Sequence, residues 1–258
     1  MTCISNRATL AAPTLPQAHR PGINALAATQ LQVDIAPYPG MDEGDLIELF
    51  WNDCFVASRR ITAGKIGTPT RLRVPESFIH SGMARVHYQV MQIGHGPAQS
   101  LTARVLVKTD CPGGDPKALC SDENQNLAPV SLPETIRRYG VNSSQIRRGV
   151  PLAIEPYLNM AAGDEITLRW GDARLDLPAI HACDVGQPIQ VWVPSRLIQE
   201  VGDDHRLEVT YCILDRVGNN SRWAPSRTLH IAAANPQAST RTVLTYQPRR
   251  PGSPCEPG

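Results

Sequence analysis

The stretch PYPGMDEGDLIELFW, residues 37–51, occurs a second time as PYLNMAAGDEITLRW, residues 156–170. With an offset of 119 positions, residues 37–79 align with residues 156–198 without a gap and share 16 identities in 43 positions. A four-residue insertion then raises the offset to 123, and the match continues to Ile213. The chain therefore contains two copies of one unit of about 100 residues, which is the size of a single β-sandwich domain.

Within each copy, apolar and polar residues alternate with a period of two. Ile166, Leu168 and Trp170 alternate with polar residues, and the matching strand of copy one does the same except that Phe50 interrupts its polar face. Such alternation over five to seven residues, bounded by Gly, Pro and Asp, is typical of half-buried antiparallel strands. The sequence predicts an all-β fold made of two antiparallel β-sandwiches in tandem.

The composition shifts divide the chain into five segments. Residues 109–129 are rich in Gly, Pro and acidic residues, and the C-terminal end is rich in Pro, which is linker or tail composition. We therefore expect a disordered N-terminus over residues 1–8, β-sandwiches over 9–109 and 127–234, a linker over 110–126, and a Pro-rich tail over 235–258.

The bulk composition excludes several classes of partner. The 258 residues include 25 Lys and Arg against 24 Asp and Glu, so no strong field attracts nucleic acid. No run approaches the length of a membrane span, and the N-terminus lacks the apolar core of a secretory signal. The expectation is a protein that is cytoplasmic or exported by a non-classical route or a specialised secretion system.

Three motifs of copy two, Y-x-x-M-A-A-G-D-x-I-x-L-x-W, D-V-G-Q-P-I-x-V-x-V-P and V-T-Y-x-I-x-D-x-x-G-N-x-S, carry a family resemblance. They resemble the bacterial immunoglobulin-like repeats that occur in tandem in adhesin-like and other large bacterial proteins. The resemblance covers residues 9–109 and 127–233 and implies immunoglobulin-like sandwiches. Copy one departs from it at residues 92–97, where the D-x-x-G-N-x-S hairpin is missing.

Four aromatic residues are in phase with the inward side of their strands. Trp51 and Trp170 are expected to anchor the two cores, and Tyr88 and Tyr211 to have a structural role, with a hydroxyl capped by nearby backbone. The Asp of each Gly-Asp pair, Asp164 in copy two, is interpreted as a turn-stabilising residue, with calcium ligation as the alternative.

The candidate binding residues are those at which the copies differ. Trp192 lies between two inward residues and should point outward, whereas copy one has Arg73 at that position; Trp223 falls in a loop. The two tryptophans could form one platform for a protein or a cell-surface glycan, or Trp192 could pack on the neighbouring domain or the linker. His95 lies in residues 92–97 of copy one, the hairpin at which this copy differs from copy two.

The cysteines and histidines do not predict a cofactor. Cys111 and Cys120 bracket a short linker loop and could form a disulfide in an oxidising compartment. His181, Cys183 and Cys212 lack the spacing of a zinc site, so no metal and no cofactor are expected.

No enzyme motif is present. The sequence lacks G-x-S-x-G, a P-loop and H-E-x-x-H, and no catalytic residue is predicted. The leading hypothesis is a non-enzymatic bacterial tandem immunoglobulin-like protein that acts as a protein-binding, adhesion-like or spacer module. The alternative is a glycan-binding accessory module that uses its outward tryptophans.

Overall fold

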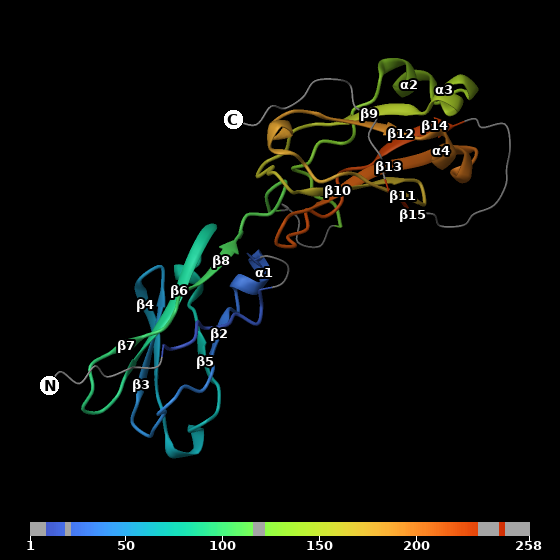
Figure 1. The fold of residues 1–258 in the computed structure, drawn as a ribbon. Helices are drawn as coiled ribbons and strands as arrows, with labels where there is room; N and C mark the ends of the chain where they lie inside the picture. The colour runs from blue at the N-terminus through green and yellow to red at the C-terminus, as the bar shows by residue number, and fades with distance from the viewer. Residues whose placement is uncertain (1–8, 19–21, 116–121, 232–242, 246–258) are drawn as a thin grey trace. The chain divides into compact units, whose positions relative to one another are not determined.

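The computed structural model describes residues 9–18, 22–115, 122–231 and 243–245. The chain forms two compact units (Figure 1). Unit 1 comprises the described residues of Met1–Thr109 together with Val217–Asn219, and unit 2 comprises those of Asp110–Arg216 and Asn220–Gly258. Each unit contains one copy of the sequence repeat.

In its described residues, unit 1 contains eight strands in two sheets. One sheet has the order β1-β8-β6-β3-β4, with the short β7 also pairing with β6, and the other consists of β2 and β5. Its elements are β1 (Gly22–Ile23), α1 (Ala25–Ala28), β2 (Gln32–Ile35), β3 (Leu46–Trp51), β4 (Cys54–Arg60), η1 (Ala63–Lys65), β5 (Thr70–Arg73), η2 (Glu76–Phe78), β6 (Gly82–Met91), β7 (Ala98–Gln99) and β8 (Ala103–Val107).

Unit 2 repeats this arrangement with longer helices. Its larger sheet has the order β14-β13-β10-β11-β15, and its smaller sheet consists of β9 and β12. Its elements are α2 (Glu134–Tyr139), α3 (Ser143–Arg148), β9 (Val150–Ile154), β10 (Glu165–Trp170), β11 (Ala173–Asp176), η3 (Ala182–Asp184), β12 (Ile189–Val193), α4 (Ser195–Val201), β13 (Asp204–Leu214), β14 (Arg227–Ile231) and β15 (Val243–Thr245).

The two copies place matching residues on matching strands. At the offset of 119 positions, β3 and β4 of unit 1 correspond to β10 and β11 of unit 2, and both pairs are antiparallel hairpins inside the larger sheet. In each unit the apolar residues of the two sheets form one buried cluster. The predicted all-β fold, two tandem immunoglobulin-like β-sandwiches, is therefore the fold of the chain.

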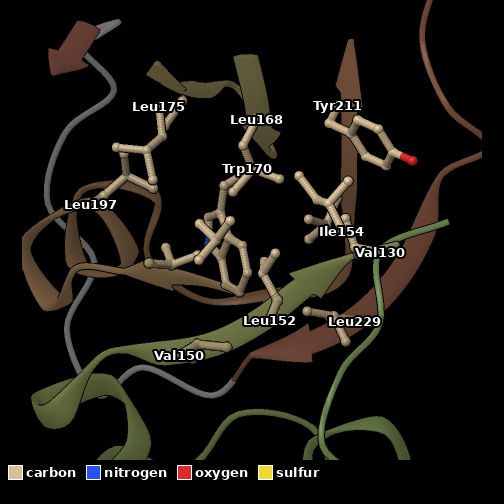
Figure 2. Close-up of a cluster of buried hydrophobic side chains, with 14 of the residues drawn as sticks. Val130, Val150, Leu152, Ile154, Leu168, Trp170, Leu175, Leu197, Tyr211 and Leu229 are labelled. Carbon is tan, nitrogen blue, oxygen red and sulfur yellow. The ribbon is translucent and has the colours of Figure 1, made fainter. Parts of the chain in front are cut away.

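A tryptophan occupies the centre of each core. Figure 2 shows the Trp170 indole among the apolar side chains of β9 and β10, such as Leu152 and Leu168. Trp51 and Trp170 are 1% and 0% exposed, and neither indole N–H has a hydrogen-bond partner among the described residues. Both rings are therefore retained for the apolar surface that they bury rather than for a polar contact.

The two inward tyrosines are buried as well. Tyr88 on β6 and Tyr211 on β13 are 1% and 0% exposed. The Tyr211 hydroxyl donates a hydrogen bond of 2.8 Å to the carbonyl of Ala128. The expected backbone cap therefore exists for Tyr211, but it comes from a segment 83 residues upstream rather than from the local corner of a sandwich.

The repeated phrase forms the same hydrogen-bonded loop in both units. In unit 2 the Tyr157 hydroxyl donates to Oδ2 of Asp164 at 2.9 Å, and the backbone N–H of Ala161 donates to the same atom at 3.0 Å. In unit 1 the Tyr38 hydroxyl donates to Oδ2 of Asp45 at 2.9 Å. Both aspartates are buried, so each carboxylate exchanges hydration for fixed donors. We call this Tyr–Asp hydrogen bond, Tyr38 to Asp45 and Tyr157 to Asp164, the lock. The phrase is repeated because each sandwich has its own lock before the strand that follows, β3 or β10.

Alkaline pH should destabilise both units through their tyrosines. Burial and the neighbouring carboxylates raise the pKa of Tyr38 and Tyr157, and burial is the first cause of the raised pKa of Tyr211. A raised pKa means that the unfolded chain releases these protons first. The stabilisation is thus complete below about pH 10, the ordinary tyrosine pKa, and is lost as the pH rises towards the higher pKa of the folded state.

Phenolate absorbance measured against pH tests this prediction. At the same alkaline pH, the native chain should show less phenolate than the chain unfolded in urea. Equal phenolate signals in the two states would contradict the burial and carboxylate contacts of these tyrosines.

The predicted linker is, in its described parts, folded onto unit 2. We call residues 110–115 and 122–129 the strap. The backbone N–H of Gly113 donates to the carbonyl of Leu158 at 2.7 Å, and the Asn159 side chain donates to the carbonyl of Cys111 at 2.9 Å. Leu127 is 2% exposed and belongs to the unit 2 core. Apolar residues are sparse in this segment, but it is an integral part of the second sandwich.

Asn124 fastens the strap. It is 0% exposed, and its amide donates to the carbonyls of Gly114 at 3.2 Å and Ser221 at 3.1 Å. The side-chain oxygen Oδ1 of Asn124 accepts from the backbone N–H of Asn126 at 3.0 Å. One buried side chain thus joins two stretches of the strap to the turn that precedes β14.

Replacing Asn124 with alanine should loosen the strap. The substitution leaves two buried carbonyls and one N–H without their partner, which costs about 1–3 kcal/mol for each group left unsatisfied. We expect faster proteolytic cleavage between Asp122 and Pro129. The matched control is Gln125→Ala, because Gln125 is exposed. Equal cleavage rates for the two variants would contradict the role of the Asn124 hydrogen bonds in holding the strap.

The C-terminal segment contributes one strand to unit 2. Within the predicted tail, residues 243–245 form β15, which pairs in parallel with β11 through Arg174↔Val243, Leu175↔Leu244 and Asp176↔Thr245. The remainder of that tail, residues 235–242 and 246–258, and the predicted disordered N-terminus, residues 1–8, lie outside the described residues.

Candidate functional site

Trp192 lies on the outer surface of the smaller sheet of unit 2, as its parity on β12 predicts. Its side chain is 48% exposed, and its indole N–H donates 2.9 Å to the carbonyl of Arg148 at the end of α3. Gly149 approaches so closely that an added Cβ would lie 2.3 Å from the indole nitrogen. The ring is therefore fixed in place by α3 of its own unit rather than resting on the strap.

Trp223 holds the strap to unit 2 through its backbone. Its backbone N–H donates to the carbonyl of Asp122 at 3.1 Å, and its carbonyl accepts from the backbone N–H of Asn124 at 2.7 Å. The Arg169 guanidinium lies over its ring, 5.0 Å from the centroid, in a cation–π contact. One face of this indole is thus already covered by a side chain of β10.

The two tryptophans do not form a common platform. Trp192 faces outward from the β9–β12 sheet, whereas Trp223 packs on Arg169, which alternates with the inward residues Leu168 and Trp170 and so faces outward from the larger sheet. The two outer surfaces of a sandwich point in opposite directions. The contacts of each ring therefore place Trp192 and Trp223 on separate outer surfaces of unit 2.

Arg73 and His95 lie towards different ends of unit 1. Arg73 pairs with Gln32 at the start of β2, and its guanidinium donates to the carbonyl of Thr29 at 3.0 Å. His95 is exposed in the turn between β6 and β7. The side chain of Gln92, at the base of that turn, donates to the carbonyl of Gly40 beyond the end of β2 at 2.8 Å. Within unit 1, Arg73 and His95 are consequently not brought together as one site.

The cysteine and metal expectations are only partly within the described residues. Cys120 lies outside them, so the possible Cys111–Cys120 disulfide is not described. Over the described ranges, no group of three or more His, Cys, Asp or Glu side chains could hold a metal ion. His181 and Cys183 lie at the short η3 helix, and Cys212 lies on β13.

A ladder of three rings crosses the outer face of the larger sheet of unit 1. Phe50 on β3 pairs with Phe55 on β4 and with His87 on β6. The Phe50 and His87 rings stack with centroids 5.0 Å apart and planes 3° apart, and Phe55 meets Phe50 edge-on at 6.2 Å. Phe55 is 52% exposed, so the ladder ends in a large apolar side chain in solvent.

The turn between β3 and β4 fixes the free end of the ladder. Asn52 and Asp53 both have positive φ, 49° and 65°, as a two-residue type I′ hairpin turn requires. The Asn52 side chain accepts from the backbone N–H of Arg85 at 2.8 Å, which ties the turn to β6. The Asp53 carboxylate pairs with Arg85 and lies 4.0 Å from Nδ1 of His87.

Copy two has none of these rings at the matching positions. Phe50 corresponds to Arg169, Phe55 to Arg174 and His87 to Thr210. Arg174 pairs with Asp176 and Arg169 lies on Trp223, so the corresponding positions of unit 2 carry charged side chains that already have partners. The aromatic surface is therefore a property of copy one alone.

The sequence contained one signal for this ladder. Phe50 interrupts an otherwise polar face, and a large aromatic at an outward position of an antiparallel strand is unusual. Phe55 and His87 were not among the predicted site residues. Their contact with Phe50 depends on which strands pair with β3 and in which register, and neither is written in the local sequence.

The chain consists of two tandem β-sandwiches of immunoglobulin-like fold, each built from one copy of the internal repeat. No protein-family model and no curated protein matches the sequence. Fibronectin type III-like modules of Clostridium thermocellum CbhA match in structure with a TM-score of 0.40 and 9% identity, covering 89% of this chain and 99% of theirs.

Two further solved structures are similar. The BSP domain of a biofilm-associated protein has a TM-score of 0.26 and 8% identity, covering 87% of this chain and 30% of that one. A tetra-tandem repeat from the extending region of a large adhesion protein has a TM-score of 0.31 and 13% identity, covering 86% and 49%. The chain thus spans less than half the length of these two structures.

In the described ranges, no helix is long and apolar enough to cross a membrane.

Proposed function

We propose that the chain is a non-enzymatic protein-binding module whose contact surface is the ring ladder of unit 1. The observation that carries this proposal is Phe55, a phenylalanine 52% exposed at the end of a fixed aromatic stack on a sheet face. Exposed aromatic side chains that are held in one conformation lose little entropy on binding. For this reason aromatic residues dominate the energetics of protein interfaces.

The charged groups around the ladder suit a protein partner. The Asp53–Arg85 ion pair lies beside the rings, and the exposed Arg60 follows on the same face of β4, opposite Leu46. An apolar centre with a charged rim is the usual layout of an interface between folded proteins. The proposed partner therefore presents an apolar patch bordered by polar residues, and unit 2 supplies a second rigid sandwich on the same chain.

Affinity capture with matched variants tests this function. The bait is the full chain, and the variants are Phe55→Ser and the control Leu101→Ser, which removes another apolar side chain that is 58% exposed in unit 1. A partner identified with the unmodified chain should bind Phe55→Ser about 30-fold more weakly, as loss of an aromatic hot spot costs about 2 kcal/mol. Equal affinity for both variants would remove the ladder from the interface.

The glycan-binding alternative rests on Trp192 alone. Its ring is held by the bond to Arg148, and its 48% exposure leaves apolar surface on which a sugar could stack. A glycan array probed with the full chain and with Trp192→Ala separates the two functions. A signal lost in Trp192→Ala and kept in Phe55→Ser would favour the glycan, and no signal on any glycan would exclude it.

A further inference from the structure

Two histidines that are 25 residues apart in the sequence meet on the outer face of unit 2. His205 lies on β13 and His230 on the neighbouring strand β14, and both are exposed. Their Nδ1 atoms are 3.0 Å apart, and their rings are nearly parallel, with planes 13° and centroids 4.8 Å apart. Two imidazole nitrogens thus lie side by side at the surface, at a separation that one bound ion could span.

A β-bulge brings the pair together. The ladder between β13 and β14 runs from Asp204↔Ile231 to Leu207↔Leu229, so His205 and Arg206 together oppose the single residue His230. A bulge of this kind redirects a side chain that a regular strand would place elsewhere, and bulges are enriched beside functional sites. Here the redirected side chain is His205.

The backbone beneath His230 is held from its other side. The backbone N–H of Val141 donates to the carbonyl of His230 at 2.8 Å, and Val141 forms a parallel bridge with Ile231. Gly140 packs so tightly against this carbonyl that an added Cβ would lie 2.3 Å from the oxygen. The backbone of His230 is therefore held by β13 on one side and by residues 140–141 on the other, which reduces the entropy lost when a ligand binds.

The matching place in copy one has neither feature. With the offset of 123 positions, His205 corresponds to Gly82, and the ladder from Gly82↔Val107 to Val86↔Ala103 runs without a register shift. The residue of β8 that corresponds to His230 is Leu106, which pairs with Met83. Both the bulge and the histidines are thus absent from one copy of the repeat, so the sandwich fold does not require them.

We propose that His205 and His230 form a binding site for a divalent first-row transition metal, with Ni²⁺ or Cu²⁺ preferred. Imidazole is a good ligand for these ions, and metal–nitrogen bonds of about 2.0–2.1 Å place two nitrogens about 2.9 Å apart at an angle near 90° and about 3.4 Å apart at a tetrahedral angle. The observed 3.0 Å fits the angle near 90° that Ni²⁺ and Cu²⁺ favour. Over the described residues no third protein ligand joins the pair, so water or a partner group completes the coordination.

Isothermal titration of the full chain with Ni²⁺ tests the site. We expect one Ni²⁺ ion per chain, with affinity lowered about tenfold or more in His205→Asn and in His230→Asn, because each variant removes one arm of a two-armed ligand. His95→Asn and His181→Asn are the controls, since both residues are exposed and outside the pair. Circular dichroism of each variant establishes that the sandwich is intact.

Three results would overturn the proposal. The first is the absence of Ni²⁺ binding to the unmodified chain, which would leave the 3.0 Å contact as a hydrogen bond between two imidazoles. The second is equal affinity of the unmodified chain and both pair variants for Ni²⁺. The third is tighter binding of Zn²⁺ than of Ni²⁺, which would contradict the angle on which the choice of metal depends.

Discussion

Replacing Trp170 with alanine is expected to lower the free energy of unfolding of unit 2 by about 3–5 kcal/mol, the usual cost of truncating a buried tryptophan. The side chain is 0% exposed and lies between the two sheets, so the sandwich cannot close the cavity without moving β9 or β10 (Figure 2). Trp170→Phe should cost much less, because it keeps an aromatic ring and removes a buried N–H that has no partner among the described residues.

Hydrogen exchange is the appropriate measurement for this prediction. The chain has two compact units, so a single denaturation curve does not report on unit 2 alone. The backbone amides of β10 and β13 report its opening directly. Trp192→Ala is the control and should cost less than about 1.5 kcal/mol, because it removes a half-exposed ring and one hydrogen bond. A loss below about 1 kcal/mol for Trp170→Ala would refute its place in the core.

The second large effect is expected at the lock of the repeated phrase. Asp164→Ala removes the acceptor of both the Tyr157 hydroxyl and the Ala161 N–H, and hydrogen bonds to a charged group are worth about 1.5–3 kcal/mol each. We expect the free energy of unfolding of unit 2 to fall by about 2–4 kcal/mol, because the Ala161 N–H can partly replace its lost hydrogen bond. Asp172→Ala, in the exposed turn at the other end of β10, should change stability by less than about 0.5 kcal/mol.

A double-mutant cycle separates the lock from calcium ligation. If Asp164 acts through Tyr157, the Tyr157→Phe and Asp164→Asn changes should be non-additive, with a coupling energy of about 0.5–3 kcal/mol. If the carboxylate held calcium instead, a chelator would lower the melting temperature of the unmodified chain. We expect strong coupling and no effect of the chelator. An additive pair would contradict the lock.

The sequence was sufficient to predict the sandwiches because the information is local and is written twice. Ile166, Leu168 and Trp170 alternate with polar residues, and the same alternation returns in copy one, so strand type and inward face follow directly. The outward position of Trp192 on β12 follows from the same parity. These inferences need no knowledge of which strands are neighbours.

The parts that the sequence did not reveal depend on non-local pairing. His205 meets His230 only because a bulge shifts one register, and the ring ladder exists only because β3 lies between β4 and β6. The strap was hidden for another reason. Its attachment uses backbone groups and one buried amide, Asn124, so its composition is that of an ordinary linker although its hydrogen bonds are those of a domain.

The strap also determines what can be inherited or exchanged as one piece. A gene fragment cut at residue 127, the boundary that composition suggests, would deprive Trp223 of its backbone partners at Asp122 and Asn124 and leave Ser221 without the Asn124 amide. A fragment that starts at Asp110 retains all of these bonds. The second repeat is therefore inherited intact only when the strap and the sandwich are kept together. Recombination within the strap would separate the sandwich from part of its own fold.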